Sequence, residues 1–304
     1  MLPEAPEIHC AQEPPSGRTG AGIDVVIVAY NNESTIASAL SSLADRLPGC
    51  HVYLVDHASP PTTMAVARQD ADLRGLTITT EADAGNPGFG AGCNRMAAQG
   101  SGQWLLFLNP DARIQAWPWR SVREIPDRTI VGANLIDEKG CEQRHFGWNW
   151  TTWSEIQRGW LRRKPRVPDG SGFVSGAAML IQRKTFTDLC GFDTGYFLFY
   201  EDIDLCFRAG RAGVRVCVEP DWKVEHLLGH SARTDWSAAL LASLRSGQRF
   251  HAMWDGSSRA YDLFMTVDGA LRATAHLGLG RRRRAKAHFA VMTAAAKSLV
   301  RRPT

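Results

Sequence analysis

Three carboxylates lie close together in one short, otherwise apolar segment of this chain. Glu201, Asp202 and Asp204 fall within residues 197–208. Carboxylates so near one another repel each other and resist burial, so we expect them to face a cavity, a cation or a substrate. A helix beginning near residue 200 would place Glu201 and Asp204 on one face. The alternative is that they only stabilise the start of that helix through its dipole.

Polar residues also follow two apolar runs that have the composition of buried strands. Asp56 follows the run 51–55, and Asn109-Pro110-Asp111 follows the run 103–108. Ligands of open parallel sheets bind at the carboxyl ends of strands, where such side chains point into the crevice. For Asp56 the alternative is a helix cap for the next segment.

A glycine-rich segment, residues 85–94, lies between these two runs. It is not a dinucleotide-binding fingerprint, because Cys93 stands where the third glycine would fall, counting from Gly88. Closely spaced glycines let backbone amides approach a ligand and let the chain bend before a helix. A purely structural turn is the alternative.

Four segments in this order, 52–59, 85–94, 105–112 and 197–208, resemble the inverting family 2 glycosyltransferases with the GT-A fold. The likeness is strongest to the rhamnosyltransferase-like branch and covers residues 23–231. It implies a nucleotide-sugar donor and Mg²⁺ or Mn²⁺ as cofactor. The donor-binding residues it implies are Ala29, Tyr30, Asn32, Asp56, Asn86, Gly88, Phe89, Gly90, Asn94, Asn109 and Asp111.

The resemblance also implies individual roles. Asp56 would accept a hydrogen bond from the pyrimidine N3–H of the nucleotide, although His57 replaces the asparagine usual in the family. Asp202 would be the base, since an inverting transfer needs a carboxylate to take the proton of the attacking hydroxyl. Asn109 replaces the first aspartate of the family's Asp-x-Asp motif, which leaves Asp111 as a charged metal ligand with His226 as its partner. The acceptor would be bound by Gly176, Glu201 and Trp148.

The periodicity of the chain predicts an α/β fold. Apolar β-branched runs alternate with amphipathic segments up to about residue 115 and then give way to strands with longer connections. This pattern favours an open, mostly parallel Rossmann-like sheet flanked by helices, with a helical C-terminal extension. The strands expected are 24–30, 51–55, 76–80, 103–108, 129–136, 172–181 and 214–218; the helices expected are 36–47, 62–73 and one that opens near Asn94.

The charge is unevenly distributed along the 304 residues. No acidic residue follows Asp268, whereas nine arginines and lysines do. Since the net charge of the whole chain is +4, residues 1–268 carry a net charge of about −5. This basic tail suits an anionic membrane surface; it could also be a solvated end or a helix that packs on the catalytic domain. We expect a disordered lead-in (1–22), a catalytic domain (23–231) and a helical extension (232–304).

The resemblance, together with the basic tail, implies a cytoplasmic glycosyltransferase, peripheral to the inner face of the cell membrane. Its expected reaction moves a sugar, best L-rhamnose from dTDP-L-rhamnose, to a glycan or polyprenyl-linked acceptor of a surface polysaccharide. One alternative is a transferase of the same fold that uses a UDP-sugar, for example of the galactofuranose type. The other is a non-catalytic relative that binds a nucleotide sugar. We expect no nucleic-acid partner, because the carboxylate-rich centre would repel phosphate.

Overall fold

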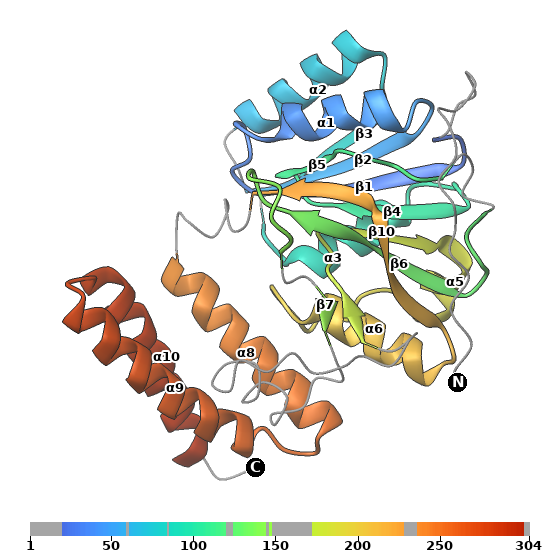
Figure 1. Ribbon diagram of the computed structural model, residues 1–304. Helices are drawn as coiled ribbons and strands as arrows, with labels where there is room; N and C mark the ends of the chain where they lie inside the picture. The colour runs from blue at the N-terminus through green and yellow to red at the C-terminus, as the bar shows by residue number, and fades with distance from the viewer. Residues whose placement is uncertain are drawn as a thin grey trace.

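The computed structural model describes residues 20–58, 61–83, 85–119, 124–143, 146–147, 172–227 and 236–300. Its centre is an eight-stranded sheet with the order β3-β2-β1-β4-β9-β6-β10-β5, accompanied by a small two-stranded sheet of β7 and β8 (Figure 1). The strands are β1 (Ile23–Ala29), β2 (His51–His57), β3 (Thr77–Asp83), β4 (Trp104–Leu108), β5 (Ala112–Ile114), β6 (Thr129–Ile136), β7 (Phe146–Gly147), β8 (Phe173–Val174), β9 (Ala178–Gln182) and β10 (Arg215–His226).

The sheet is mostly parallel, as expected. β9 runs antiparallel to β4 and β6, and β5 runs antiparallel to β10, while β1 pairs in parallel with β2 and β4. The expected strand 172–181 is two strands, β8 and β9, because the chain turns at residues 175–177. β8 pairs with β7, and β9 belongs to the eight-stranded sheet. The short strand β5 was not predicted.

Helices cover both faces of the sheet. On one face α1 (Ile36–Arg46) and α2 (Thr62–Arg74) pack on Val25 and Ile27 of β1. On the other, α3 (Phe89–Ala97) and α6 (Glu201–Arg211) pack on Val26 and its neighbours, and the short α5 (Arg183–Asp188) follows β9. Since β1 is buried on both sides, its residues 25–29 form a continuous apolar run rather than an alternating one, and Asp24 near its start is buried as well.

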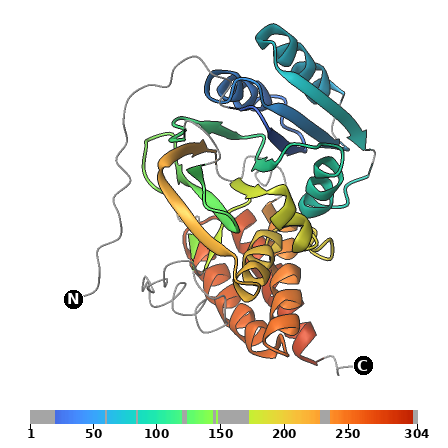
Figure 2. The same ribbon diagram turned by 90° about the vertical axis from the view of Figure 1, so that its right-hand side faces the viewer.

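Three further helices form a C-terminal bundle on the α6 side of the molecule (Figure 2). They are α8 (Trp236–Trp254), α9 (Arg259–Gly278) and α10 (Arg282–Val300). Phe250 of α8 is fully buried and packs on Tyr200 at the start of α6. The Ser246 hydroxyl also donates to the carbonyl of Leu198 at 2.9 Å. The extension is therefore attached to the catalytic domain through α8.

The domain boundaries stay predictions. The expected boundary at residue 231 lies outside the described residues, as does the lead-in up to residue 19. Gly20, placed in the lead-in, is buried and its amide donates to the carbonyl of Pro48 at 3.1 Å, so ordered structure begins before residue 23.

Candidate active site

Asp202 lies in the first turn of α6, at the edge of the sheet where the strand ends meet. One carboxylate oxygen accepts the backbone N–H of Gly176 at 2.9 Å and the other accepts that of Ile203 at 2.8 Å. Burial raises the pKa of Asp202, and these two N–H donors oppose the rise. A carboxylate has about four acceptor positions, so room remains to accept a proton from a substrate.

The start of α6 is set by an unusual backbone. Phe199 and Tyr200 both adopt left-handed conformations, with φ of +66° and +70°, although neither is glycine. Strain of this kind persists only where the surroundings enforce it. Here Tyr200 is buried against Phe250, and its hydroxyl donates to the hydroxyl of Tyr261 at 3.3 Å. The C-terminal bundle thus holds the turn that presents Asp202.

Glu201, which was predicted to bind the acceptor, is buried. Its side chain is 5% exposed and packs against Gly90 of α3. Burial, and then the charge of Asp202, raise the pKa of Glu201 well above its usual range. Glu201 is therefore buried between α3 and α6, and its contact with the acceptor stays a prediction.

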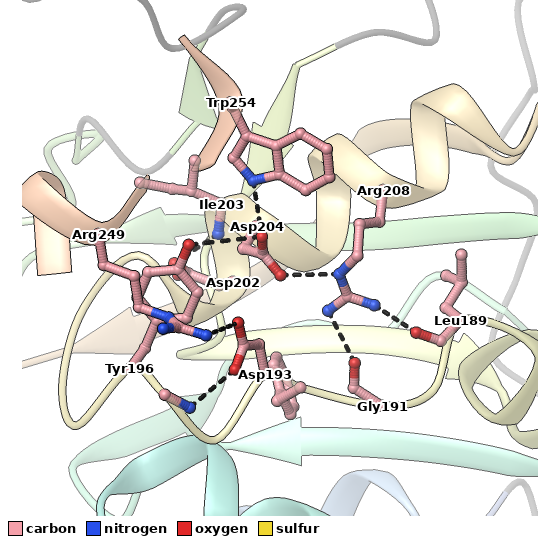
Figure 3. Close-up of polar contacts among 12 residues, drawn as sticks. Leu189, Gly191, Asp193, Tyr196, Asp202, Ile203, Asp204, Arg208, Arg249 and Trp254 are labelled. Atoms are coloured by element: carbon pink, nitrogen blue, oxygen red, sulfur yellow. Dashed lines mark hydrogen bonds and ion pairs between the residues drawn. The ribbon is translucent and has the colours of Figure 1, made fainter. Parts of the chain in front are cut away.

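Asp204 is buried and serves as an anchor, as Figure 3 shows. It accepts hydrogen bonds from Arg208 Nε at 2.7 Å and from the indole N–H of Trp254 at 2.9 Å. Arg208 also donates to the carbonyls of Leu189 and Gly191. This network joins α6, the preceding loop and α8. The spacing of four between Asp204 and Arg208 could have indicated the first of these pairs.

Asp111 and His226 are brought together, as the metal-site prediction requires. His226 ends β10 and pairs in register with Ala112 of β5, so its side chain meets the motif that precedes β5. His226 Nε2 lies 3.4 Å from Asp111 Oδ1 and 3.3 Å from the Asn109 amide nitrogen. Both Asp111 and His226 are at most 9% exposed.

This pair fits one divalent cation. Two ligand atoms at right angles around an ion, each at about 2.1 Å, lie about 3 Å apart, close to the Asp111–His226 separation. Within the described ranges no cluster of three or more His, Cys, Asp or Glu side chains forms a metal site. Mg²⁺ in nucleotide sites usually combines one or two protein ligands with phosphate oxygens and water, which matches this arrangement.

The base and the metal-site residues are connected through the turn before β9. Gly176 donates its N–H to Asp202, and the carbonyl of the next residue, Ala177, accepts the N–H of Asn109 at 2.9 Å. A side chain at Gly176 would press on Phe89. The predicted acceptor residue Gly176 therefore lies at the centre of the site and positions Asp202.

The glycine-rich segment contacts the site through Phe89, whose ring lies beside Gly176. The prediction that a helix opens near Asn94 is wrong, because α3 begins at Phe89 and includes six residues of this segment, 89–94. Gly90 and Gly92 let α3 lie close to Phe192 and to β1 and β2. Asn86 accepts the N–H of Gly88 at 3.2 Å, and Phe89 donates its N–H to the carbonyl of Phe197 at 3.1 Å.

Asn94 has a structural function in this arrangement. Its amide donates to the carbonyl of Phe192 at 2.8 Å and accepts the N–H of the same residue at 2.9 Å. The predicted donor-binding group is thus engaged with the loop before α6. The side chain holds that loop against α3.

Gly88→Ala should destabilise the protein. Gly88 has φ of +101°, and a Cβ there would collide with the carbonyl oxygen of Phe197. We expect the free energy of unfolding to fall by at least about 1 kcal/mol in chemical denaturation. Gly85→Ala is the matched control, since that position is exposed and has room for a methyl group. Equal losses in the two variants would contradict this explanation.

The ends of β1 and β2 supply the remaining predicted donor residues. Ala29 ends β1 beside Asp56, which is 4% exposed, and Tyr30 follows at 40% exposed. The side chain of Asn32 is fully buried and accepts the N–H of Tyr30 at 2.8 Å, so it shapes the loop. His57 points to the opposite face of the sheet from Asp56, toward Gly92, and burial lowers its pKa.

Asp56→Ala should weaken nucleotide binding. Loss of one charge-assisted hydrogen bond to the base costs about 1.5–3 kcal/mol. Calorimetric titration with the free nucleoside diphosphate should therefore show a dissociation constant raised about ten-fold or more. Asp45→Ala, on the exposed end of α1, should leave the affinity unchanged. Unchanged affinity in Asp56→Ala would leave Asp56 as a structural residue.

Some predicted residues lie outside the described part of the chain. The candidate site residue among them is Trp148, which was predicted to bind the acceptor. In the part of the chain that the structure describes, no helix combines the length and the apolar character needed to cross a bilayer.

The comparisons with known proteins agree with this geometry. The model of the family described as glycosyl transferase family 2 matches residues 24–189, which is more than half of the chain. The chain belongs to glycosyltransferase family 2. A second model, glycosyltransferase like family 2, matches residues 156–247 of this glycosyltransferase.

Two relatives carry rhamnosyltransferase names. The chain is 26% identical over 309 residues to the N-acetylglucosaminyl-diphospho-decaprenol L-rhamnosyltransferase of Mycobacterium tuberculosis, covering 87% of this chain and 96% of the relative. It is 40% identical over 80 residues to the rhamnosyltransferase WbbL of Escherichia coli K12, covering 26% of this chain and 30% of the relative.

Solved structures confirm the GT-A fold. The mannosyltransferase PcManGT of Pyrobaculum calidifontis, solved with GDP-Man and Mn²⁺, superposes with a TM-score of 0.55 at 18% identity, over 94% of this chain and 77% of that one. GalNAc-T7 with UDP, GalNAc and Mn²⁺ gives 0.51 at 17% identity, over 67% of this chain and 43% of that one.

Proposed function

We propose that this glycosyltransferase moves L-rhamnose from dTDP-L-rhamnose to a hydroxyl of a lipid-linked glycan in cell-envelope synthesis, with inversion at the anomeric carbon. One observation carries the proposal. The N–H of Gly176 holds the Asp202 carboxylate, and the carbonyl of the next residue, Ala177, accepts the N–H of Asn109 in the metal motif. The rhamnosyltransferase from M. tuberculosis, aligned over almost its whole length, supports the choice of donor and acceptor.

Each residue has a defined task in this reaction. Asp56 accepts a hydrogen bond from the nucleotide base, and the segment around Gly88 and Phe89 lines the donor pocket. Asp202 takes the proton of the acceptor hydroxyl as that oxygen forms a bond to the anomeric carbon and the bond to the nucleoside diphosphate breaks. A base on the face opposite the leaving group gives inversion.

Asp111 and His226 would hold the divalent cation, Mg²⁺ or Mn²⁺. Such a cation stabilises the negative charge of the departing diphosphate. Support comes from the 3.4 Å separation of the two side chains and from the two structural relatives, both of which were solved with Mn²⁺. The reaction would take place at the cytoplasmic face of the cell membrane, where a polyprenyl-linked acceptor is anchored.

A thermal-shift screen of nucleotide sugars with and without Mn²⁺ tests the donor, because a ligand that binds only the folded state raises its melting temperature. We expect dTDP-L-rhamnose with Mn²⁺ to give the largest rise. Transfer of rhamnose to an N-acetylglucosaminyl-diphospho-polyprenol would then be followed by mass spectrometry. A larger shift with a UDP-sugar would replace the donor, and binding without transfer or hydrolysis would indicate a non-catalytic relative.

A further inference from the structure

One long face of α9 is apolar and exposed. Leu263, Val267, Leu271 and Leu277 are 57%, 39%, 56% and 60% exposed. At 100° per residue they share one side of the helix with smaller uncharged residues. The residues on this side are 259, 260, 263, 267, 270, 271, 274, 277 and 278, and Arg259, the first residue of the helix, is the one among them that carries a charge. Exposed leucines occur singly on most proteins, whereas a contiguous patch marks an interaction surface.

The opposite side of α9 is already packed. Tyr261, Phe264 and Ala273 are buried in the bundle, and Gly269 lets α10 lie close at Met292. The α9–α10 hairpin lies on the side of α8 away from the sheet (Figure 1). The apolar face of α9 therefore points away from its own bundle.

The charges around this face are almost all positive. Leu279, 65% exposed, extends the face into the turn, and the exposed residues Arg281–Arg284 follow directly. The two acidic residues of α9 and α10 are engaged elsewhere. Asp262 is buried and accepts from Gln248, Ser258 and Ser298, and Asp268 accepts from Arg272 at 2.6 Å.

We propose that this face, together with the arginines of the α9–α10 turn, docks on the surface of an anionic lipid bilayer. The leucines would enter the headgroup boundary while the arginines contact anionic headgroups. A second copy of the chain would cover the leucines equally well, but its own α9 and α10 would bring no available carboxylate to the four arginines. Charge complementarity therefore selects the lipid surface.

This placement changes the expectation drawn from the basic tail. The surface expected to contact the membrane was the basic tail that follows Asp268. In the structure α10 turns Val291 and Ala295 into the bundle and leaves Phe289 exposed. The larger apolar surface belongs to α9, and the basic residues at the start of α10 extend it.

The direction in which the α9–α10 turn faces suits a lipid-linked acceptor. In this respect the inference rests on the proposed function. In Figure 1 the turn between α9 and α10 points to the same side as the arrowheads of β6 and β10, where the active-site residues gather. A bilayer contacted by this turn would lie on the side of the molecule from which an anchored acceptor arrives.

Vesicle cosedimentation of the full chain tests the proposal without donor or acceptor. Wild type should sediment with vesicles of phosphatidylglycerol and phosphatidylcholine, more weakly at high salt, and poorly with phosphatidylcholine alone. The double variant Leu263→Gln/Leu271→Gln should lose about ten-fold or more of its partition coefficient. Leu73→Gln on α2, where the leucine is 78% exposed, is the matched control and should bind as wild type does.

Two further measurements complete this test. Hydrogen exchange of the wild-type protein should show protection of residues 260–284 on addition of anionic vesicles, with α2 unchanged, and it needs no variant to fold. Transfer to a short water-soluble acceptor should be the same in the double variant, which separates this inference from the proposed reaction. The proposal would be overturned if the double variant bound vesicles as fully as wild type. It would also be overturned if the wild type formed a dimer and the double variant were monomeric but still bound vesicles.

Discussion

Replacing Asp202 with asparagine should lower turnover by about 10²-fold or more while donor binding survives. Asparagine keeps the shape of the side chain, but its single oxygen can accept only one of the two N–H groups of Gly176 and Ile203, and it cannot take a proton. Single-turnover rates and calorimetric donor affinity, measured on the same preparation, separate the two effects. Turnover within a few-fold of wild type would mean that another residue is the base.

The neighbouring carboxylate provides the matched control. Because burial raises the pKa of Glu201, its folded form holds a proton more tightly than its unfolded form, and the protein loses stability as pH rises through the window between these two pKa values. Glu201→Gln should therefore keep most of the activity and be no less stable at neutral pH. A collapse of turnover in this variant, with normal turnover in Asp202→Asn, would exchange their roles.

The pH dependence of turnover in the wild-type enzyme should also identify Asp202 as the base. A base works in its deprotonated form, and burial raises the pKa of Asp202. Turnover should therefore rise with pH through an acidic limb that lies above the usual range of an aspartate. This limb should disappear in the residual activity of Asp202→Asn. A limb that persists there unchanged would belong to a different group.

Asp111→Ala should abolish metal-dependent donor binding. Asp111 supplies the carboxylate of the motif at the end of β4, and His226 Nε2 lies 3.4 Å from it. Calorimetry with the nucleoside diphosphate should show that added Mn²⁺ no longer raises affinity, since one ligand and one negative charge are lost. His226→Ala should weaken the same effect.

The control for this variant is Asp221→Ala, an exposed aspartate on the same strand as His226. It should retain the full response to Mn²⁺. An unchanged Mn²⁺ response in Asp111→Ala would remove Asp111 from the metal site, and an unchanged response in His226→Ala would leave His226 as a structural histidine.

The part of the site that could be predicted from sequence is the part set by strand ends. Asp56 and Asp111 follow buried apolar runs, and parallel pairing brings such ends to one edge of the sheet. The motif resemblance added His226, but its meeting with Asp111 depends on the register of β10 with the unpredicted strand β5. Three residues of β5 are too few to give a periodic signal.

The remaining features depend on tertiary contacts that leave little trace in the sequence. No local pattern predicts left-handed Phe199 and Tyr200, and the conformation of Tyr200 is supported by its packing on Phe250 of α8 and its hydrogen bond to Tyr261 of α9. The hydrogen bond from Trp254 to Asp204 joins residues fifty positions apart. The glycines of α3 have poor helix propensity, so the helix was expected to begin after them, whereas close packing requires them within it.

The anomeric configuration of the transferred sugar tests the central claim most directly. NMR of the product made from dTDP-L-rhamnose and the lipid-linked acceptor, compared with the donor, should show inversion at the anomeric carbon. That outcome requires direct attack by the hydroxyl that Asp202 deprotonates. A product with retained configuration would contradict the account.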